Sequence, residues 1–84
     1  MPEVTVYSGP QCPYCTKAKA LLDKKKVVYE EFNVKEDSSK LDEMMERSGG
    51  RKTIPQIFIN GQHIGGCDDL YALDAAAKLD ELLI

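Results

Sequence analysis

The spacing of the hydrophobic residues changes once within the first 25 residues, and this change strongly constrains the fold. Residues 4–7 (Val-Thr-Val-Tyr) are β-branched and aromatic, and Ser8-Gly9-Pro10 follows, which is typical of a strand that ends in a loop. From Pro13, a residue suited to the first position of a helix, apolar residues recur at helical spacing, at Ala18, Leu21 and Leu22. The sequence therefore predicts a strand joined to an amphipathic helix by a short loop.

The next segment repeats this order of strand and helix. Residues 27–34 form the second predicted strand, and alternation places Val28, Phe32 and Val34 on one face. Residues 36–39 (Glu-Asp-Ser-Ser) are a helix-start cluster, and Ser48-Gly49-Gly50 ends the helix that follows. The side chains expected to point inward from this helix are Leu41, Met44 and Met45.

A hairpin and a final helix complete the pattern. Residues 56–59 form a short apolar strand, Asn60-Gly61 is a strong turn signal, and residues 62–64 return as the paired strand. A last helix opens at Cys67, and its apolar stripe consists of Leu70, Leu73, Ala77, Leu79, Leu82 and Leu83. The order β-α-β-α-β-β-α predicts an α/β fold in which helices flank a mixed four-stranded sheet, within one domain over residues 1–84.

Composition narrows the class of protein. The chain has 43% hydrophobic and 30% charged residues, as soluble globular proteins do, and its net charge of −3 argues against nucleic acid as a partner. No segment reaches the roughly 18 apolar residues that cross a membrane. The N-terminus lacks the basic and apolar regions of a signal peptide, so we expect a cytoplasmic, reducing location.

The motif Cys12-Pro13-Tyr14-Cys15 lies where the first strand gives way to the first helix. Cys12 falls near the N-cap and Cys15 near the third helical position, so the free N–H groups and the positive end of the helix favour a thiolate at Cys12. Three-residue spacing brings both sulfurs to one side of the helix. We predict that Cys12 is a nucleophile and that Cys15 is less exposed and more often protonated.

Two alternatives for the cysteines remain open at this stage. The pair could be structural, or it could join His63 and Cys67 in a zinc site, although a zinc ribbon normally carries a second Cys-X-X-Cys. Cys67 could also be a third redox thiol, but it is more simply a helix-start residue whose backbone binds a ligand. His63 is more simply a surface or partly buried residue than a catalyst. No metal is expected.

Two further segments favour a thiol-bearing peptide as ligand. Thr53-Ile54-Pro55 precedes a strand, and beside a redox Cys-X-X-Cys it suggests a cis-proline that turns the backbone of Ile54 toward an extended substrate. Gly65-Gly66 permits close approach to the backbone, and the following helix start binds carboxylates. Asp68 and Asp69 could pair with an amine or cap that helix, and the two roles are compatible.

Taken together, these motifs resemble the glutaredoxin family, in particular the dithiol Cys-Pro-Tyr-Cys type of small bacterial glutaredoxins. The resemblance spans the whole chain. It implies a thioredoxin-like fold, glutathione-dependent thiol–disulfide oxidoreductase activity, and roles in electron transport and cell redox homeostasis. It implies Cys12 as nucleophile, Cys15 as resolving thiol of a redox disulfide, and glutathione contacts at Tyr14, Thr53, Ile54, Pro55, Cys67, Asp68 and Asp69.

The resemblance also implies partners. Glutathione is the co-substrate, no cofactor is tightly bound, and a monomer reduces glutathionylated or disulfide-containing proteins, with ribonucleotide reductase as one candidate. Relatives often place a lysine shortly before the first cysteine to hold the glycine carboxylate of glutathione. Here residues 8–11 are Ser-Gly-Pro-Gln, and Arg51 or Lys52 could substitute. A thioredoxin-like reductase served by a flavoprotein and an iron–sulfur carrier are the competing functions.

Overall fold

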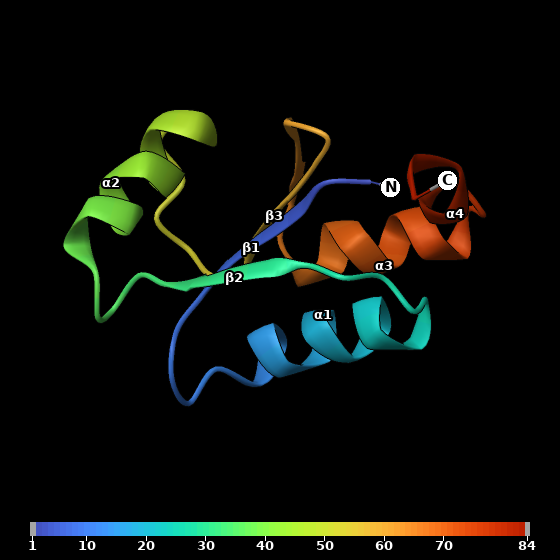
Figure 1. Ribbon diagram of the computed structural model, residues 1–84, viewed down its shortest axis with the longest axis horizontal. Helices are drawn as coiled ribbons and strands as arrows, with labels where there is room; N and C mark the ends of the chain where they lie inside the picture. The colour runs from blue at the N-terminus through green and yellow to red at the C-terminus, as the bar shows by residue number, and fades with distance from the viewer. Residues whose placement is uncertain (1, 84) are drawn as a thin grey trace.

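The computed structural model describes residues 2–83, which form four strands and four helices (Figure 1). The strands are β1 (Val4–Ser8), β2 (Glu30–Asn33), β3 (Gln56–Ile59) and β4 (Gln62–Gly65), and the helices are α1 (Pro13–Lys24), α2 (Ser38–Arg47), α3 (Cys67–Ala75) and α4 (Leu79–Leu82). Up to α3 this is the order predicted from the sequence.

The strands form one mixed sheet in the order β2-β1-β3-β4. β1 and β2 are parallel and are connected through α1, whereas β1 pairs with β3 and β3 with β4 in antiparallel fashion. Asn60 and Gly61 both have positive φ at the β3–β4 turn, as the hairpin signal predicted. The prediction of a mixed four-stranded sheet flanked by helices is confirmed.

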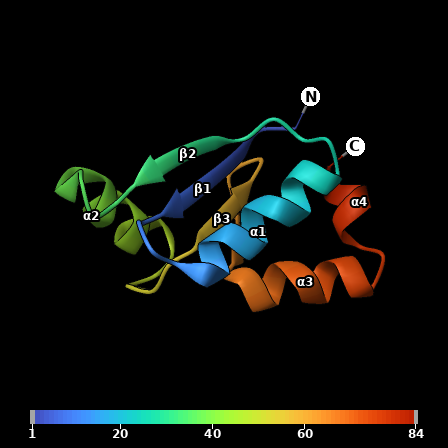
Figure 2. The same ribbon diagram turned by 90° about the horizontal axis from the view of Figure 1, so that it is seen from below.

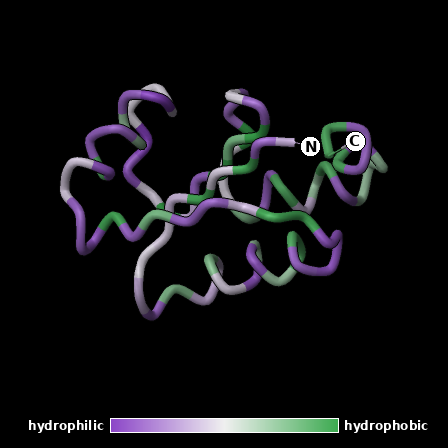
Figure 3. Tube along the Cα trace, in the orientation of Figure 1, coloured by the Kyte–Doolittle hydropathy of each residue, from purple (hydrophilic) through white to green (hydrophobic). Residues whose placement is uncertain are grey.

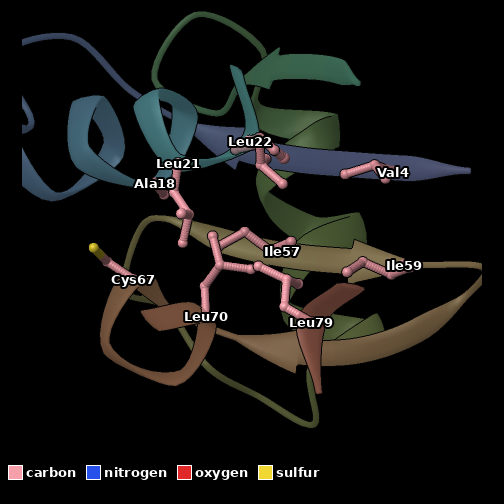
Figure 4. Close-up of a cluster of buried hydrophobic side chains, with 10 residues drawn as sticks. Val4, Ala18, Leu21, Leu22, Ile57, Ile59, Cys67, Leu70 and Leu79 are labelled. Atoms are coloured by element: carbon pink, nitrogen blue, oxygen red, sulfur yellow. The ribbon is translucent and has the colours of Figure 1, made fainter. Parts of the chain in front are cut away.

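The larger core lies between the sheet and the pair formed by α1 and α3. These two helices run side by side across one face of the sheet, and both begin at the same edge (Figure 2). Ala18, Leu21 and Leu22 are buried against Ile57 of β3, as Figure 4 shows, so the predicted inner face of α1 is confirmed. Burying a leucine or isoleucine side chain stabilises the fold by about 1.5–3 kcal/mol.

The opposite face of the sheet is covered more sparsely, by α2 alone (Figure 1). Met44 is fully buried there against Tyr7 and Phe58, with Leu41 packed at the margin, while most of α2 is hydrophilic (Figure 3). Asp37 caps the helix by accepting the backbone N–H of Ser39 at 3.0 Å, as the helix-start cluster predicted.

Two predicted positions are wrong. Val28 does not point inward: its side chain is 74% exposed, because the second strand starts only at Glu30 and the connection from α1 turns through Lys26 at a φ of 60°. Ala77 does not extend the apolar stripe of the last helix. It has a φ of 59°, which ends α3, and a separate helix α4 begins at Leu79.

No helix within residues 2–83 combines the length and the apolar character needed to cross a membrane.

Candidate active site

Cys12 is the N-cap residue of α1, with Pro13 at the first helical position. Its backbone is extended, and its Sγ accepts the backbone N–H of Cys15 at 3.2 Å. Such an N–H has no partner within the helix, and it donates more strongly to a thiolate than to a thiol. The sulfur therefore sits at the positive end of α1, partly exposed, in the place that the sequence predicted.

Cys15 has a different environment one turn into the helix. Its side chain is only 1% exposed, and Cys12, Cys15 and Cys67 are all free thiols. Burial, and next the hydrogen bond with Cys12, raise the pKa of Cys15 to about 12, while the backbone N–H of Gly9 opposes this shift. The expected difference in exposure is confirmed: Cys15 is buried, whereas Cys12 is partly exposed.

The loop before β3 lies against Cys12. The Ile54–Pro55 peptide bond is cis, as predicted, and the Sγ of Cys12 lies 4.0 Å from the carbonyl oxygen of Ile54. A sulfur bound at Cys12 is therefore beside a backbone group that an extended peptide can pair with.

A buried amide supports this loop. The Nε2 of Gln56 donates to the carbonyl oxygen of Thr53 at 3.0 Å and to its Oγ1 at 3.1 Å, and the Oε1 of Gln56 lies 2.7 Å from the Nε2 of His63. Because a carbonyl oxygen can only accept, the amide orientation is fixed and His63 must donate from Nε2. Burial, followed by the charge of Arg51, lowers the pKa of His63. His63 thus orients Gln56. This structural role, at a partly buried position, lies within the predicted range of a surface or partly buried residue.

The start of α3 forms the other wall of the site. Gly66 is its N-cap residue, and Asp69 accepts the backbone N–H of Gly66 at 3.0 Å. Gly65 has a φ of 120°, and a Cβ there would collide with the Asp69 side chain. The Nη1 of Arg51 lies 3.6 Å from the Oδ2 of Asp69, so the capping carboxylate also holds a cation at this helix end. The N-termini of α1 and α3 thus face the same part of the surface (Figure 2).

These elements enclose an open pocket of about 340 Å³. Its lining contains all seven residues that the sequence predicted as glutathione contacts, together with Arg51 and Gly66: Tyr14, Arg51, Thr53, Ile54, Pro55, Gly66, Cys67, Asp68 and Asp69. Tyr14 is 58% exposed. Cys67 belongs to the core cluster, but its sulfur points away from the other labelled side chains (Figure 4). Arg51 was only one of two candidate cations in the sequence, and Lys52 does not line the pocket.

The zinc alternative lacks a ligand set in this arrangement. Across the part of the chain that the structure describes, no group of three or more His, Cys, Asp or Glu side chains is placed to hold a metal ion. The Nε2 of His63 is already used by Gln56.

Comparisons with known proteins agree with the geometry. The family model described as Glutaredoxin matches residues 4–64. Glutaredoxin 3 of Escherichia coli K12 is 55% identical over 83 residues, which is 99% of either chain. The solution structure of glutaredoxin from Brucella melitensis has 52% identity and a TM-score of 0.83, covering 96% of this chain and 87% of that one.

A crystal structure titled as a buckwheat glutaredoxin–glutathione complex has 28% identity and a TM-score of 0.88, covering 98% of this chain and 76% of that chain. These likenesses over almost the whole length confirm the thioredoxin-like fold that the motifs implied.

Proposed function

Because the chain belongs to the glutaredoxin family, its activity is glutathione-dependent thiol–disulfide oxidoreduction, and we propose that Cys12 is the nucleophile of that reaction and Cys15 the resolving thiol. One observation carries the assignment: the Sγ of Cys12 is partly exposed at the N-terminus of α1 and accepts the N–H of Cys15 at 3.2 Å, whereas Cys15 is buried. Of the two sulfurs, only Cys12 combines access with stabilisation of a negative charge.

The monothiol reaction needs Cys12 alone. Its thiolate attacks the glutathionyl sulfur of a mixed disulfide, the substrate leaves as a thiolate that takes a proton from solvent, and Cys12 carries glutathione. The thiolate of a second glutathione attacks that glutathionyl sulfur. Glutathione disulfide leaves, and the Cys12 thiolate is restored at the helix N-terminus, where the N–H of Cys15 stabilises it.

The dithiol reaction adds Cys15. When Cys12 has attacked a protein disulfide, Cys15 loses its proton and attacks the Cys12 sulfur, which releases the reduced protein and leaves a Cys12–Cys15 disulfide. Two equivalents of glutathione then reduce that disulfide. Burial is the largest cause of the raised pKa of Cys15, and the negative charge of Cys12 is a smaller one. Formation of the mixed disulfide removes that charge, so Cys15 becomes a better nucleophile at this stage.

We assign glutathione to the pocket between the two helix N-termini. An extended tripeptide with its sulfur at Cys12 can pair with the backbone at Ile54, and Tyr14, Thr53, Pro55 and Cys67 line its path. The amino-acid end of the γ-glutamyl group suits the start of α3. There the free N–H groups and Arg51 favour its carboxylate, and Asp68 and Asp69 favour its amine.

We also propose the location, oligomeric state and protein substrates of this chain. The protein acts as a single-domain cytoplasmic monomer that uses glutathione as co-substrate and needs no tightly bound cofactor. It reduces glutathionylated or disulfide-containing proteins, with ribonucleotide reductase as one candidate. These assignments rest on the resemblance of the motifs to those of small bacterial glutaredoxins.

The deciding experiment is reduction of a small glutathione mixed disulfide, coupled to glutathione reductase and NADPH. Wild type and Cys15→Ser should be active, and Cys12→Ser should be inactive because the remaining sulfur of the motif, that of Cys15, is buried. Loss of activity in Cys15→Ser, with Cys12 intact, would contradict the monothiol half of the mechanism.

A further inference from the structure

The loop before Cys12 provides no cation, but the side chain of Lys35 occupies the space above it. Residues 8–11 are Ser-Gly-Pro-Gln. A Cβ placed on Gly9 would lie 3.1 Å from the Cγ of Lys35 and 2.8 Å from the Cδ1 of Ile54. The Cε of Lys35 is still only 3.9 Å from that point, so the ammonium group, one bond further, stays beside Gly9. A residue remote in sequence thus brings a positive charge to the loop.

The backbone at Lys35 is ordered by the side chain of Asn33. Asn33, the last residue of β2, accepts the backbone N–H of Lys35 at 2.9 Å and that of Glu36 at 3.3 Å through its Oδ1. Such a side-chain turn fixes the chain direction at the end of a strand. The preceding Val34 is buried against the α2 side of the sheet, which anchors the turn. The stem of Lys35 therefore starts from an ordered backbone.

The ammonium group of Lys35 has no partner among the residues that the structure describes. Within residues 2–83, no carboxylate lies within 4.0 Å of its ammonium group, whereas Lys19 pairs with Glu31 and Arg51 approaches Asp69. The nearby Asp37 accepts the N–H and the hydroxyl group of Ser39 instead. Lys35 is exposed and free to bind an anion.

This cation lies at the opposite end of the glutathione path from α3. A Cβ on Gly66, at the α3 end, would lie 3.3 Å from the carbonyl oxygen of Pro55, whereas a Cβ on Gly9 would meet both the Cδ1 of Ile54 and the stem of Lys35. Ile54 and Pro55 therefore separate two positively charged regions, one at the start of α3 with Arg51 and one at Lys35. Glutathione has a carboxylate at each end, which matches this arrangement of charge.

We propose that Lys35 binds the glycine carboxylate of glutathione from the turn after β2. It thereby supplies the positive charge that the loop before Cys12 lacks. This inference rests on the proposed function, which brings the sulfur of glutathione to Cys12 and its γ-glutamyl end to α3. Lys35 is then a substrate-binding residue that favours glutathione over thiols without this carboxylate.

The test measures transfer of glutathione from its mixed disulfide with 2-mercaptoethanol to Cys12, in a Cys15→Ser background, by rapid quench and mass spectrometry at low salt. A second substrate has the glycine carboxylate converted to an amide. Lys35→Met keeps the stem over Gly9 and removes the charge. Lys24→Met makes the same change in charge at the far end of α1 and is the matched control.

We expect Lys35→Met to lower the second-order rate constant for the acid substrate by about two- to fivefold, the range for an exposed ion pair, and to leave the amide substrate unaffected. Lys24→Met should change neither rate. An equal loss on both substrates, or no loss on the acid, would overturn the inference. Failure of the proposed function would look different, since no glutathione would reach Cys12 from either substrate even with Lys35 intact.

Discussion

The resolving step of the dithiol reaction should become faster with pH throughout the physiological range. Only the thiolate of Cys15 can attack the Cys12 sulfur, and burial is the largest cause that raises the pKa of Cys15 to about 12. At that pKa, on the order of one Cys15 in 100,000 is ionised at neutral pH. Loading Cys12 with glutathione removes the contribution of the Cys12 charge but not that of burial. The ionised fraction should therefore still rise about tenfold per pH unit between about pH 6 and pH 8.

The assay starts from wild-type protein glutathionylated at Cys12 and held at low pH. After a jump to each test pH, mass spectrometry follows the release of glutathione as the Cys12–Cys15 disulfide forms. The same species made from Cys15→Ser should release no glutathione without an added thiol, which isolates the resolving step. A release rate that levels off at or below about pH 7 would refute the argument, because it would mean that Cys15 is largely ionised in its buried position.

Three further predictions concern the scaffold. Ile57→Ala should lower the free energy of unfolding by about 2–5 kcal/mol in urea titrations, because the Ile57 side chain is fully buried between the sheet and α1; a loss below 1 kcal/mol would show that the core closes over the gap. Gly65→Ala should cost about 1–3 kcal/mol, since φ is 120° and the Asp69 side chain fills the space, and an unchanged melting curve would contradict this. Burial lowers the pKa of His63 in the native state, so the unfolded chain takes up a proton at a higher pH than the native protein does. The free energy of unfolding should therefore be highest above the ordinary histidine pKa and should decrease as the pH falls below that value. His63→Gln should flatten that decline in unfolding experiments above and below the ordinary histidine pKa, and an identical decline in both proteins would count against it.

The parts of the fold that the sequence predicted best are those specified by local chemistry. The bounds of β3 were predicted correctly because an apolar run is confined between Pro55 and the Asn60-Gly61 turn. The start of α1 was predicted because Pro13 suits only the first turn, which in turn placed Cys12 at the N-cap. Local signals of this kind depend on a few adjacent residues and do not need the rest of the structure.

The errors and omissions have a different physical origin. Val28 belongs to an apolar run, but whether a residue at the end of such a run faces inward depends on where the chain from α1 joins the sheet. Ala77 is a good helix former placed where the chain must turn between α3 and α4. Lys35 lies over Gly9 only because the turn after β2 folds beside the loop after β1. Sequence spacing carries no information about such tertiary contacts.

The shared starting edge of α1 and α3 also affects how an anionic substrate reaches the protein. The chain has a net charge of −3, so at long range it repels glutathione, which is itself a net anion. Near the pocket, the two aligned helix dipoles direct their positive ends outward from one edge of the molecule (Figure 2). The rate at which glutathione reaches the pocket therefore depends on the direction of its approach. The net charge of the protein repels glutathione at long range, but the helix N-termini attract it at this edge. Added salt should screen the long-range repulsion before it weakens the short-range attraction, so moderate ionic strength should not slow association as it does for oppositely charged partners.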